Sequence, residues 1–150
     1  MFLRAIIAFL AMPGVVALLI PAWIGAREVN AGATFHALGL LLLVPGLIAL
    51  LWCVRDFYVA GKGTLAPWSP PRNLVRIGLY RYSRNPMYVA VALMLIGWTT
   101  CFWSRTLAIY TCFVIVAFHL RVVFGEEPWL ARTHGAAWEE YRSGVPRWLL

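Results

Sequence analysis

The chain has 150 residues, of which 62% are hydrophobic and only 13% are charged. Soluble domains contain about 45–50% apolar and about 25% charged residues, so these few polar groups could not cover the apolar surface. Lipid must supply the remaining cover, which predicts a single membrane domain with no appended soluble module. The net charge of +7 could indicate a nucleic-acid partner. However, the basic residues lie between long apolar stretches, and we therefore expect no nucleic-acid binding.

Two apolar segments come first. Residues 2–24 are interrupted by Pro13 and Pro21 but are long enough to cross about 30 Å of hydrocarbon. Arg4 and the apolar stretch after it are also typical of a secretory signal, but no clear A-x-A cleavage site ends the stretch. A second, leucine-rich span covers residues 34–54. Residues 1–55 are therefore expected to hold two spans.

A helical hairpin is predicted over residues 85–125. The connection before it, residues 56–84, is rich in glycine and proline and should form a cytoplasmic loop. Asn85 is a good helix N-cap and Pro86 a favoured first helical residue, so they should begin a third apolar segment ending near residue 103. A fourth segment covers residues 106–124. Because only Ser104-Arg105 separates the two, they should be antiparallel neighbours.

Residues 126–150 form the C-terminal segment, in which residues 128–141 predict a short amphipathic helix at the membrane interface. Its larger apolar residues are Trp129, Leu130, Trp138 and Tyr141. The predicted fold is an all-α integral membrane protein with about four transmembrane helices, followed by this helix. The three cysteines, Cys53, Cys101 and Cys112, match neither a zinc site nor a redox motif. We expect them to be small buried hydrophobic residues and expect no metal site.

Lysine and arginine are distributed unequally between the ends of the four expected spans. Arg27 and Arg105 would lie on one face of the membrane and the other eleven on the opposite face. Positively charged residues favour the cytoplasmic side. We therefore expect a protein of the bacterial cytoplasmic membrane with both termini, the long loop and the active site on the cytoplasmic side. The sequence predicts no particular oligomeric state.

Polar residues gather at two places on this face. Residues 78–88 include the start of the third segment, where a helix N-terminus suits an anionic ligand group; the same residues could also serve only to begin the span. Residues 119–128 contain Glu126-Glu127, two carboxylates that are costly beside lipid unless they are paired. They could simply counter the arginines of the long loop.

The hairpin should bring these two clusters together at one end of the helix pair. Arg121 and Glu126 are five residues apart, so on a continuous α-helix they point to diverging faces. A joint role would need a bend or an unwound turn near Gly125. The combined site, with arginines, two glutamates, Tyr80 and Tyr88, suits a zwitterionic, partly aromatic cofactor beside lipid.

These motifs resemble those of the membrane-bound isoprenylcysteine carboxyl methyltransferases and related phospholipid methyltransferases. Residues 78–88 are similar to the family's G-x-Y-x-x-x-R-H-P-x-Y, and Glu126-Glu127 with Leu130 to its E-E-x-x-L. Gly135, Tyr141 and Val145-Pro146-Arg147 are similar to the closing F-G-x-x-Y-x-x-Y-x-x-x-V-P-R. The matched pieces cover about residues 72–148, which we interpret as a cofactor module.

The resemblance implies that this module binds S-adenosylmethionine. The implied cofactor contacts are Arg72, Asn73, Leu74, Val75, Tyr80, Asn85, Pro86, Met87, Tyr88 and Glu126. Two residues are the implied catalytic ones: Arg121 would engage the substrate, and Glu127 completes the acidic pair. Glu127 or His119 could help to deprotonate an amine acceptor.

The chain departs from the family pattern at several positions. Asn85 replaces the usual histidine, so proton transfer is lost there while hydrogen bonding is kept. Ala90 stands where many members have glycine, Arg72 replaces a histidine, and His134 replaces the phenylalanine before Gly135.

The resemblance implies a methyltransferase that acts at the membrane on a lipophilic acceptor entering sideways from the bilayer. The acceptor could be an isoprenylcysteine-like carboxylate, a phospholipid or another hydrophobic molecule. Two alternatives remain open. One is an NADPH-dependent membrane reductase, because sterol reductases have a similar R-H-P-x-Y and closing V-P-x pattern. The other is a non-enzymatic membrane subunit that retains the fold, which Asn85 would favour.

Overall fold

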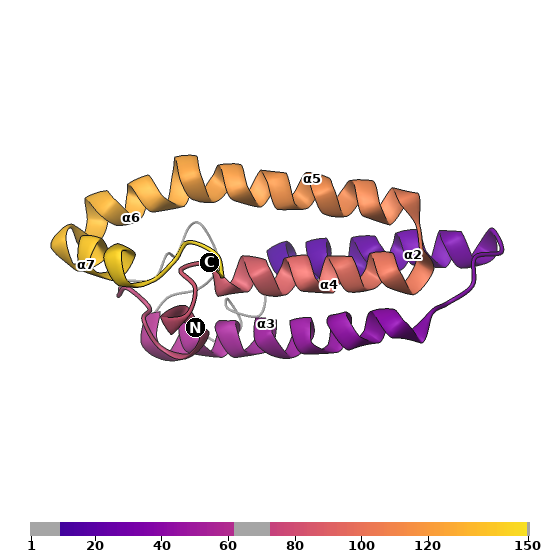
Figure 1. The fold of residues 1–150 in the computed structure, drawn as a ribbon, viewed down its shortest axis with the longest axis horizontal. Helices are drawn as coiled ribbons and strands as arrows, with labels where there is room; N and C mark the ends of the chain where they lie inside the picture. Colours follow the sequence, from indigo (N-terminus) through magenta and orange to yellow (C-terminus); the bar gives the residue numbers. More distant parts are fainter. Residues whose placement is uncertain (1–9, 62–72, 150) are drawn as a thin grey trace.

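A computed structural model of the chain describes residues 10–61 and 73–149, and all regular structure in these ranges is helical (Figure 1). The elements, in which η marks a π- or 3-10 helix, are η1 Leu10–Leu19, α2 Ile20–Asn30, η2 Ala37–Gly39, α3 Leu40–Gly61, η3 Gly78–Arg81, α4 Pro86–Phe102, α5 Arg105–Arg121, η4 Val122–Glu126, α6 Glu127–His134 and α7 Ala136–Gly144. The all-helical prediction is confirmed for the described residues.

Helix α4 is the centre of the bundle, with α3 on one side and α5 on the other (Figure 1). The axes of α3 and α4 approach closely because a glycine of each helix lies at the contact between them. A Cβ on Gly97 would lie only 2.7 Å from the backbone nitrogen of Leu43, and one on Gly46 only 3.0 Å from the carbonyl oxygen of Ala90. Small residues let membrane helices approach in this way. Ala90, the departure from the family's glycine, is buried against Gly46 and fits.

Helix η1 continues directly into α2, which has Pro21 as its second residue; we call η1 and α2 together the first helix. Proline leaves two carbonyl groups of this helix unpaired, and side chains of α4 and α5 bond them. Pro21 has no N–H, so neither an i→i−4 nor an i→i−5 bond can form to Ala17 or Val16. Trp98 Nε1 donates to the Ala17 oxygen at 3.0 Å, and the Tyr110 hydroxyl donates to the Val16 oxygen at 3.0 Å. Such side-chain donors are what make proline tolerable inside a membrane helix.

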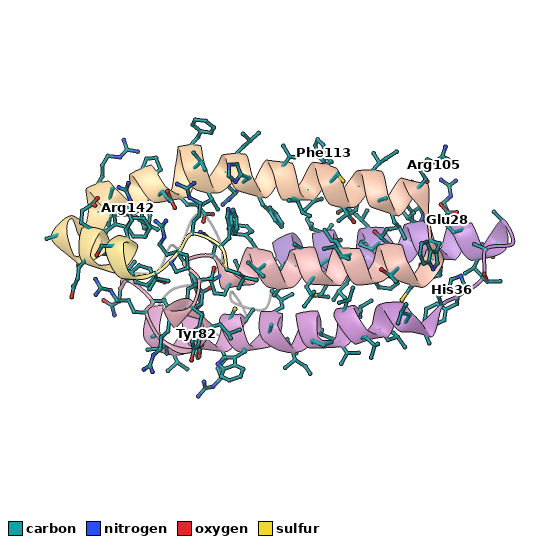
Figure 2. All side chains as sticks on the ribbon, in the orientation of Figure 1. Glu28, His36, Tyr82, Arg105, Phe113 and Arg142 are labelled. Carbon is teal, nitrogen blue, oxygen red and sulfur yellow. The ribbon has the colours of Figure 1, made fainter. Side chains whose placement is uncertain are left out.

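The turn between α4 and α5 confirms the predicted hairpin. Trp103 adopts a left-handed conformation with φ 48°, and Ser104 caps α5 by accepting from the Leu107 amide at 3.2 Å. The Ser104 hydroxyl also donates to Glu28 of α2 at 2.7 Å, which fixes the turn to the first helix. Figure 2 shows Glu28 and Arg105 at this end, and Tyr82 and Arg142 at the other. Which end is cytoplasmic stays a prediction.

Two helical stretches, Ala37–Gly61 and Arg105–His134, are long and apolar enough to cross a membrane, and Pro86–Phe102 is a shorter apolar helix. The outer face of α5 is apolar, because Ile109, Phe113, Val116 and Leu120 recur every three or four residues and are all exposed. An exposed apolar stripe of this length is typical of a lipid-facing surface. The chain is therefore a membrane protein. The count of four spans stays a prediction, since the first expected span begins outside the described residues.

Three expectations about the elements were wrong. Helix α3 continues to Gly61, seven residues past its expected end, while Arg55 reaches solvent and Asp56 is buried. The single helix expected over residues 128–141 is two helices, because Gly135 has φ 49°, a conformation that breaks a helix and favours glycine. Cys112 is exposed on the outer face of α5, unlike the buried Cys53 and Cys101.

Adding a methyl group at Gly97 should destabilise the bundle. Helix propensity alone would make alanine more stable than glycine at this position by about 1 kcal/mol. In Gly97→Ala, however, the added methyl group clashes with the α3 backbone, and the free energy of unfolding should fall by about 1–3 kcal/mol. Denaturant unfolding in detergent would measure this. Gly144→Ala is the matched control, because no atom lies near its added Cβ. Equal effects of the two substitutions would contradict the close α3–α4 contact.

Candidate functional site

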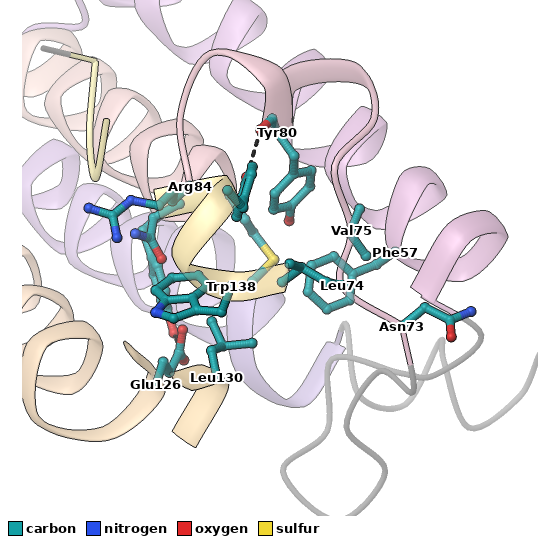
Figure 3. Close-up of a pocket in the computed structure, with 13 residues that line it drawn as sticks. Phe57, Asn73, Leu74, Val75, Tyr80, Arg84, Glu126, Leu130 and Trp138 are labelled. Atoms are coloured by element: carbon teal, nitrogen blue, oxygen red, sulfur yellow. Dashed lines mark hydrogen bonds between the residues drawn. The ribbon is translucent and has the colours of Figure 1, made fainter. Parts of the chain in front are cut away.

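A pocket lies at the end of the bundle where α4 begins and α5 continues into η4 (Figure 3). Residues of α3, η3, α4, η4, α6 and α7 contribute to its walls, together with the segment before η3. The lining residues are Phe57, Asn73, Leu74, Val75, Tyr80, Arg84, Asn85, Met87, Tyr88, Glu126, Leu130, Trp138 and Tyr141. The two polar clusters that the sequence places at one end of the hairpin therefore do meet.

A π-helical turn brings Arg121 and Glu126 together. Between α5 and α6 the chain forms η4, Val122–Glu126, in which the repeat is widened from four residues towards five. Arg121 Nε consequently donates to Glu126 Oε1 at 2.9 Å across the five-residue spacing. The unwound turn that this pairing required near Gly125 is thus present as a π-helix. Such turns are frequent at functional sites.

Tyr88 of α4 completes this group. Its hydroxyl donates to Glu126 Oε1, and Arg121 Nε also donates to the same hydroxyl at 3.1 Å. The Tyr88 ring packs on Phe118, with centroids 4.5 Å apart. Among the described residues, the side chains that bond Glu126 all reach Oε1, and none reaches Oε2. Glu126 therefore has a compensated charge and one oxygen open to a ligand.

Glu127 points to a different set of partners. Arg147 binds it bidentately, with Nε 2.9 Å from Oε1 and Nη2 2.8 Å from Oε2. Arg84 Nη1 lies 3.0 Å from Oε1 without the angle of a hydrogen bond, so that contact is electrostatic. The side chains of Glu127 and Arg84 are only 14% and 9% exposed. Two arginines thus hold a carboxylate that does not line the pocket.

Asn85 occupies the N-cap position of α4, but its side chain makes no cap bond. Instead, Asn85 Nδ2 donates to the carbonyl oxygen of Arg147 at 3.0 Å. Ser83 Oγ donates to the same oxygen at 3.3 Å and accepts from the Asn85 amide at 3.1 Å. The predicted start of the helix at Asn85-Pro86 is confirmed. The prediction that the Asn85 side chain caps the helix is wrong, because this side chain bonds the backbone oxygen of Arg147 instead.

Helix α7 forms the opposite wall and is fixed to the segment around η3. The Tyr141 hydroxyl donates to the Tyr80 carbonyl oxygen at 2.6 Å, drawn as a dashed line in Figure 3. Arg76 donates to the Ala137 oxygen and pairs with Glu140 at 3.1 Å. Burial raises the pKa of Tyr141 to about 12, so its phenol remains a donor at neutral pH.

The pocket suits an amphipathic ligand with a positive charge. Tyr80, Tyr88 and Trp138 supply aromatic rings, whose faces attract cations. Among the described lining residues Glu126 is the one carboxylate, and Asn85 is the hydrogen-bonding amide at the α4 end. Most of the other lining residues are apolar, as is usual for small-molecule sites. The described residues contain no group of three or more His, Cys, Asp or Glu side chains that could hold a metal ion.

The pocket collects most of the residues proposed to bind the cofactor. Those that line it are Asn73, Leu74, Val75, Tyr80, Asn85, Met87, Tyr88 and Glu126. Pro86 is buried as the first residue of α4 and does not line it. Arg121 does not line the pocket, but it bonds Tyr88 and Glu126, which do. His119 is exposed and stacks on Trp148, with ring centroids 6.1 Å apart. Arg72 lies outside the described residues.

Sequence reasoning missed five lining residues. Phe57 was missed because the second span was expected to end before it. Leu130, Trp138 and Tyr141 were recognised as apolar or motif residues but were assigned to an interfacial helix. Arg84, whose guanidinium lies 5.4 Å over the Trp138 ring, was interpreted as a loop charge. The signal that could have identified Leu130 and Tyr141 was their place in the family motifs.

Removing the Tyr88 hydroxyl tests the Tyr88–Arg121–Glu126 group. Tyr88→Phe should lower the free energy of unfolding by about 1–2 kcal/mol, because a half-buried hydrogen bond to a charged group is lost. Denaturant titration in detergent would measure the change. Tyr82→Phe is the control, since Tyr82 is 71% exposed and should change stability little. A Tyr88→Phe variant as stable as the control would show that the group contributes nothing to the fold.

Comparison with known proteins identifies the family. The family model described as phospholipid methyltransferase matches residues 34–137, which is more than half of the chain. No curated protein and no solved structure matches the chain. The matched residues include α3, α4, α5 and η4, and with them most of the pocket lining. The chain therefore belongs to the phospholipid methyltransferase family.

Proposed function

We propose that this protein is an S-adenosylmethionine-dependent methyltransferase that acts on a lipophilic acceptor at the membrane surface. The observation that carries the proposal is the pocket in which Glu126, the start of α4 and the aromatic residues of η3 and α7 converge. Membership of a methyltransferase family supplies the reaction class, and the chemistry of the lining residues fits the cofactor.

Five of the lining residues are the proposed cofactor contacts that carry most of this fit: Tyr80, Asn85, Met87, Tyr88 and Glu126. Glu126 offers a carboxylate to the ammonium group, Asn85 offers an amide to polar groups of the cofactor, and the tyrosine rings offer faces to the sulfonium. Asn73, Leu74 and Val75 complete this wall, and we keep Arg72 and Pro86 as proposed neighbours. The bound sulfonium supplies the methyl group.

What the protein contributes is positioning and the exclusion of water. Tyr80 is buried, which raises the pKa of its phenol, and Trp138 is only 2% exposed. These rings, one from η3 and one from α7, form a dry part of the pocket wall. A strong methyl donor needs little more than in-line approach of the acceptor.

The acceptor is proposed to enter from the bilayer beside η4. Leu120 and Phe124 are exposed apolar residues next to the half-exposed Arg121. A lipid with a polar head group could lie with its chains along this face and its head near Arg121. We propose Arg121 as the residue that orients the acceptor, and a phospholipid or an isoprenoid carboxylate as its class.

Calorimetric titration of S-adenosylmethionine into detergent-purified protein tests the cofactor. The intact protein should bind saturably, and Glu126→Ala should weaken binding about tenfold or more, because a charged partner is lost. Glu139→Ala is the matched control, since Glu139 is exposed on α7 and, within the described part of the chain, pairs with Arg142 alone.

Absence of binding to folded protein would overturn the proposal. NADPH, titrated in parallel, separates the remaining possibilities: binding that requires its 2′-phosphate would indicate a reductase, and binding of neither ligand a non-enzymatic subunit. If the cofactor binds, transfer of labelled methyl groups to phospholipid vesicles or to a prenylated cysteine would identify the acceptor.

A further inference from the structure

The last residues of the chain return from α7 to the start of α4 (Figure 1). We call residues 145–149 the tail, and the group formed by Arg84, Asn85, Glu127 and Arg147 the tail junction. At the junction the Arg84 amide donates to the Pro146 oxygen at 2.9 Å, and Asn85 donates to the Arg147 oxygen. The tail is thus bonded by its backbone to the beginning of α4.

The tail is also bonded to the helix that follows α5. Arg147 forms its bidentate ion pair with Glu127, the first residue of α6, and the Trp148 ring stacks on His119 of α5. The tail therefore bridges the ends of two helices, beside two direct contacts between them: Arg84 pairs with Glu127, and Tyr88 of α4 bonds Glu126. Opening this bridge would leave the α6 start joined to α4 by those two contacts alone.

Glu127 has the contacts of a structural anchor and lacks those of a proton acceptor. A general base must come within hydrogen-bond reach of the proton that it removes. Both Glu127 oxygens are occupied by Arg147, the side chain is largely buried, and it does not line the pocket. Its neighbour Glu126 does line the pocket, where Tyr88 and Arg121 bond its side chain, while its backbone is part of the same helical turn as Glu127.

We propose that Glu127 is a positioning residue, which uses Arg84 and Arg147 to clamp the tail and thereby holds Glu126 in place for the cofactor. The part that concerns the cofactor rests on the proposed function. Without Glu127, two arginines would face each other in a poorly solvated place, and their repulsion would expel the tail. Without Arg147, Glu127 would keep only Arg84. Either loss should loosen the α6 start and Glu126 with it.

Binding of S-adenosylhomocysteine, measured by calorimetry, tests this clamp. Glu127→Gln and Arg147→Ala should each weaken binding about tenfold, and the double variant should be no weaker than either one, because both remove the same interaction. Arg147→Lys keeps the charge but loses the bidentate geometry, and should restore part of the affinity. Arg142→Ala is the matched control: its ion pair with Glu139 is exposed, and binding should be unchanged.

Hydrogen exchange of the protein without ligand tests the junction independently of any cofactor. The backbone N–H of Arg84 reports on the tail directly, because it bonds the Pro146 oxygen. The backbone N–H groups of residues 122–127 report on η4 and the start of α6. Exchange at both places should accelerate about tenfold in Glu127→Gln and Arg147→Ala but not in Arg142→Ala, while the melting temperatures of all variants show that the bundle remains folded.

Two results would overturn the proposal. One is a Glu127→Gln variant that binds poorly while Arg147→Ala binds like the intact protein, which would make Glu127 act without the tail. The other is unchanged exchange in both variants. Failure of the intact protein to bind S-adenosylhomocysteine would instead overturn the proposed function, and the exchange result would then decide the clamp alone.

Discussion

Two adjacent carboxylates at a lipid boundary must each find a positive partner, and the site is arranged around how Glu126 and Glu127 do so. Successive residues on a helix point in different directions, so one side chain faces Arg121 and Tyr88 while the other faces Arg84 and Arg147. This divergence would separate ligand binding, proposed for Glu126, from anchoring, proposed for Glu127. The carboxylate with a free oxygen lines the pocket, and the one with both oxygens occupied fastens the chain beside it.

The bundle places these charges through a close contact between α3 and α4, in which glycines lie beside the larger core side chains Leu50 and Met94. Gly46 and Gly97 allow α3 to lie against α4, so the start of α4 lies close to the end of α3, where Phe57 enters the pocket. At the opposite end, Glu28 bonds Ser104 and fixes the turn of the hairpin. Because lipid cannot bond polar groups, the donors that complete the first helix, Trp98 and Tyr110, come from its neighbours. Most charged side chains of the described residues therefore lie at the pocket end of the bundle.

The proposed cofactor is an activated methyl donor that would require little acid–base chemistry of the protein, and this site offers little. His119 is exposed against Trp148 and Glu127 is clamped. Asn85, where relatives are expected to have histidine, bonds the backbone of the tail. This use of Asn85 accounts for the departure without loss of the site: the position needs a donor to a carbonyl oxygen, and an amide supplies it. Aromatic walls, one open carboxylate oxygen and the proposed entrance beside lipid remain as the features that would select a ligand.

The sequence by itself determined the membrane class and the helical hairpin, because composition, Asn85-Pro86 and the short Ser104-Arg105 turn act locally. The resemblance to a known family, and no local pattern, indicated eight of the thirteen pocket residues. The sequence also showed that Arg121 and Glu126 could cooperate only through an irregular turn. Only the tertiary structure decided that this turn is a π-helix, that α3 extends to Gly61 and that α6 and α7 separate at Gly135. It alone divided the roles of Glu126 and Glu127. The division between Glu126 and Glu127 depends on partners twenty or more residues away along the chain, Tyr88 for Glu126 and Arg147 for Glu127, and no local pattern encodes a contact of that kind.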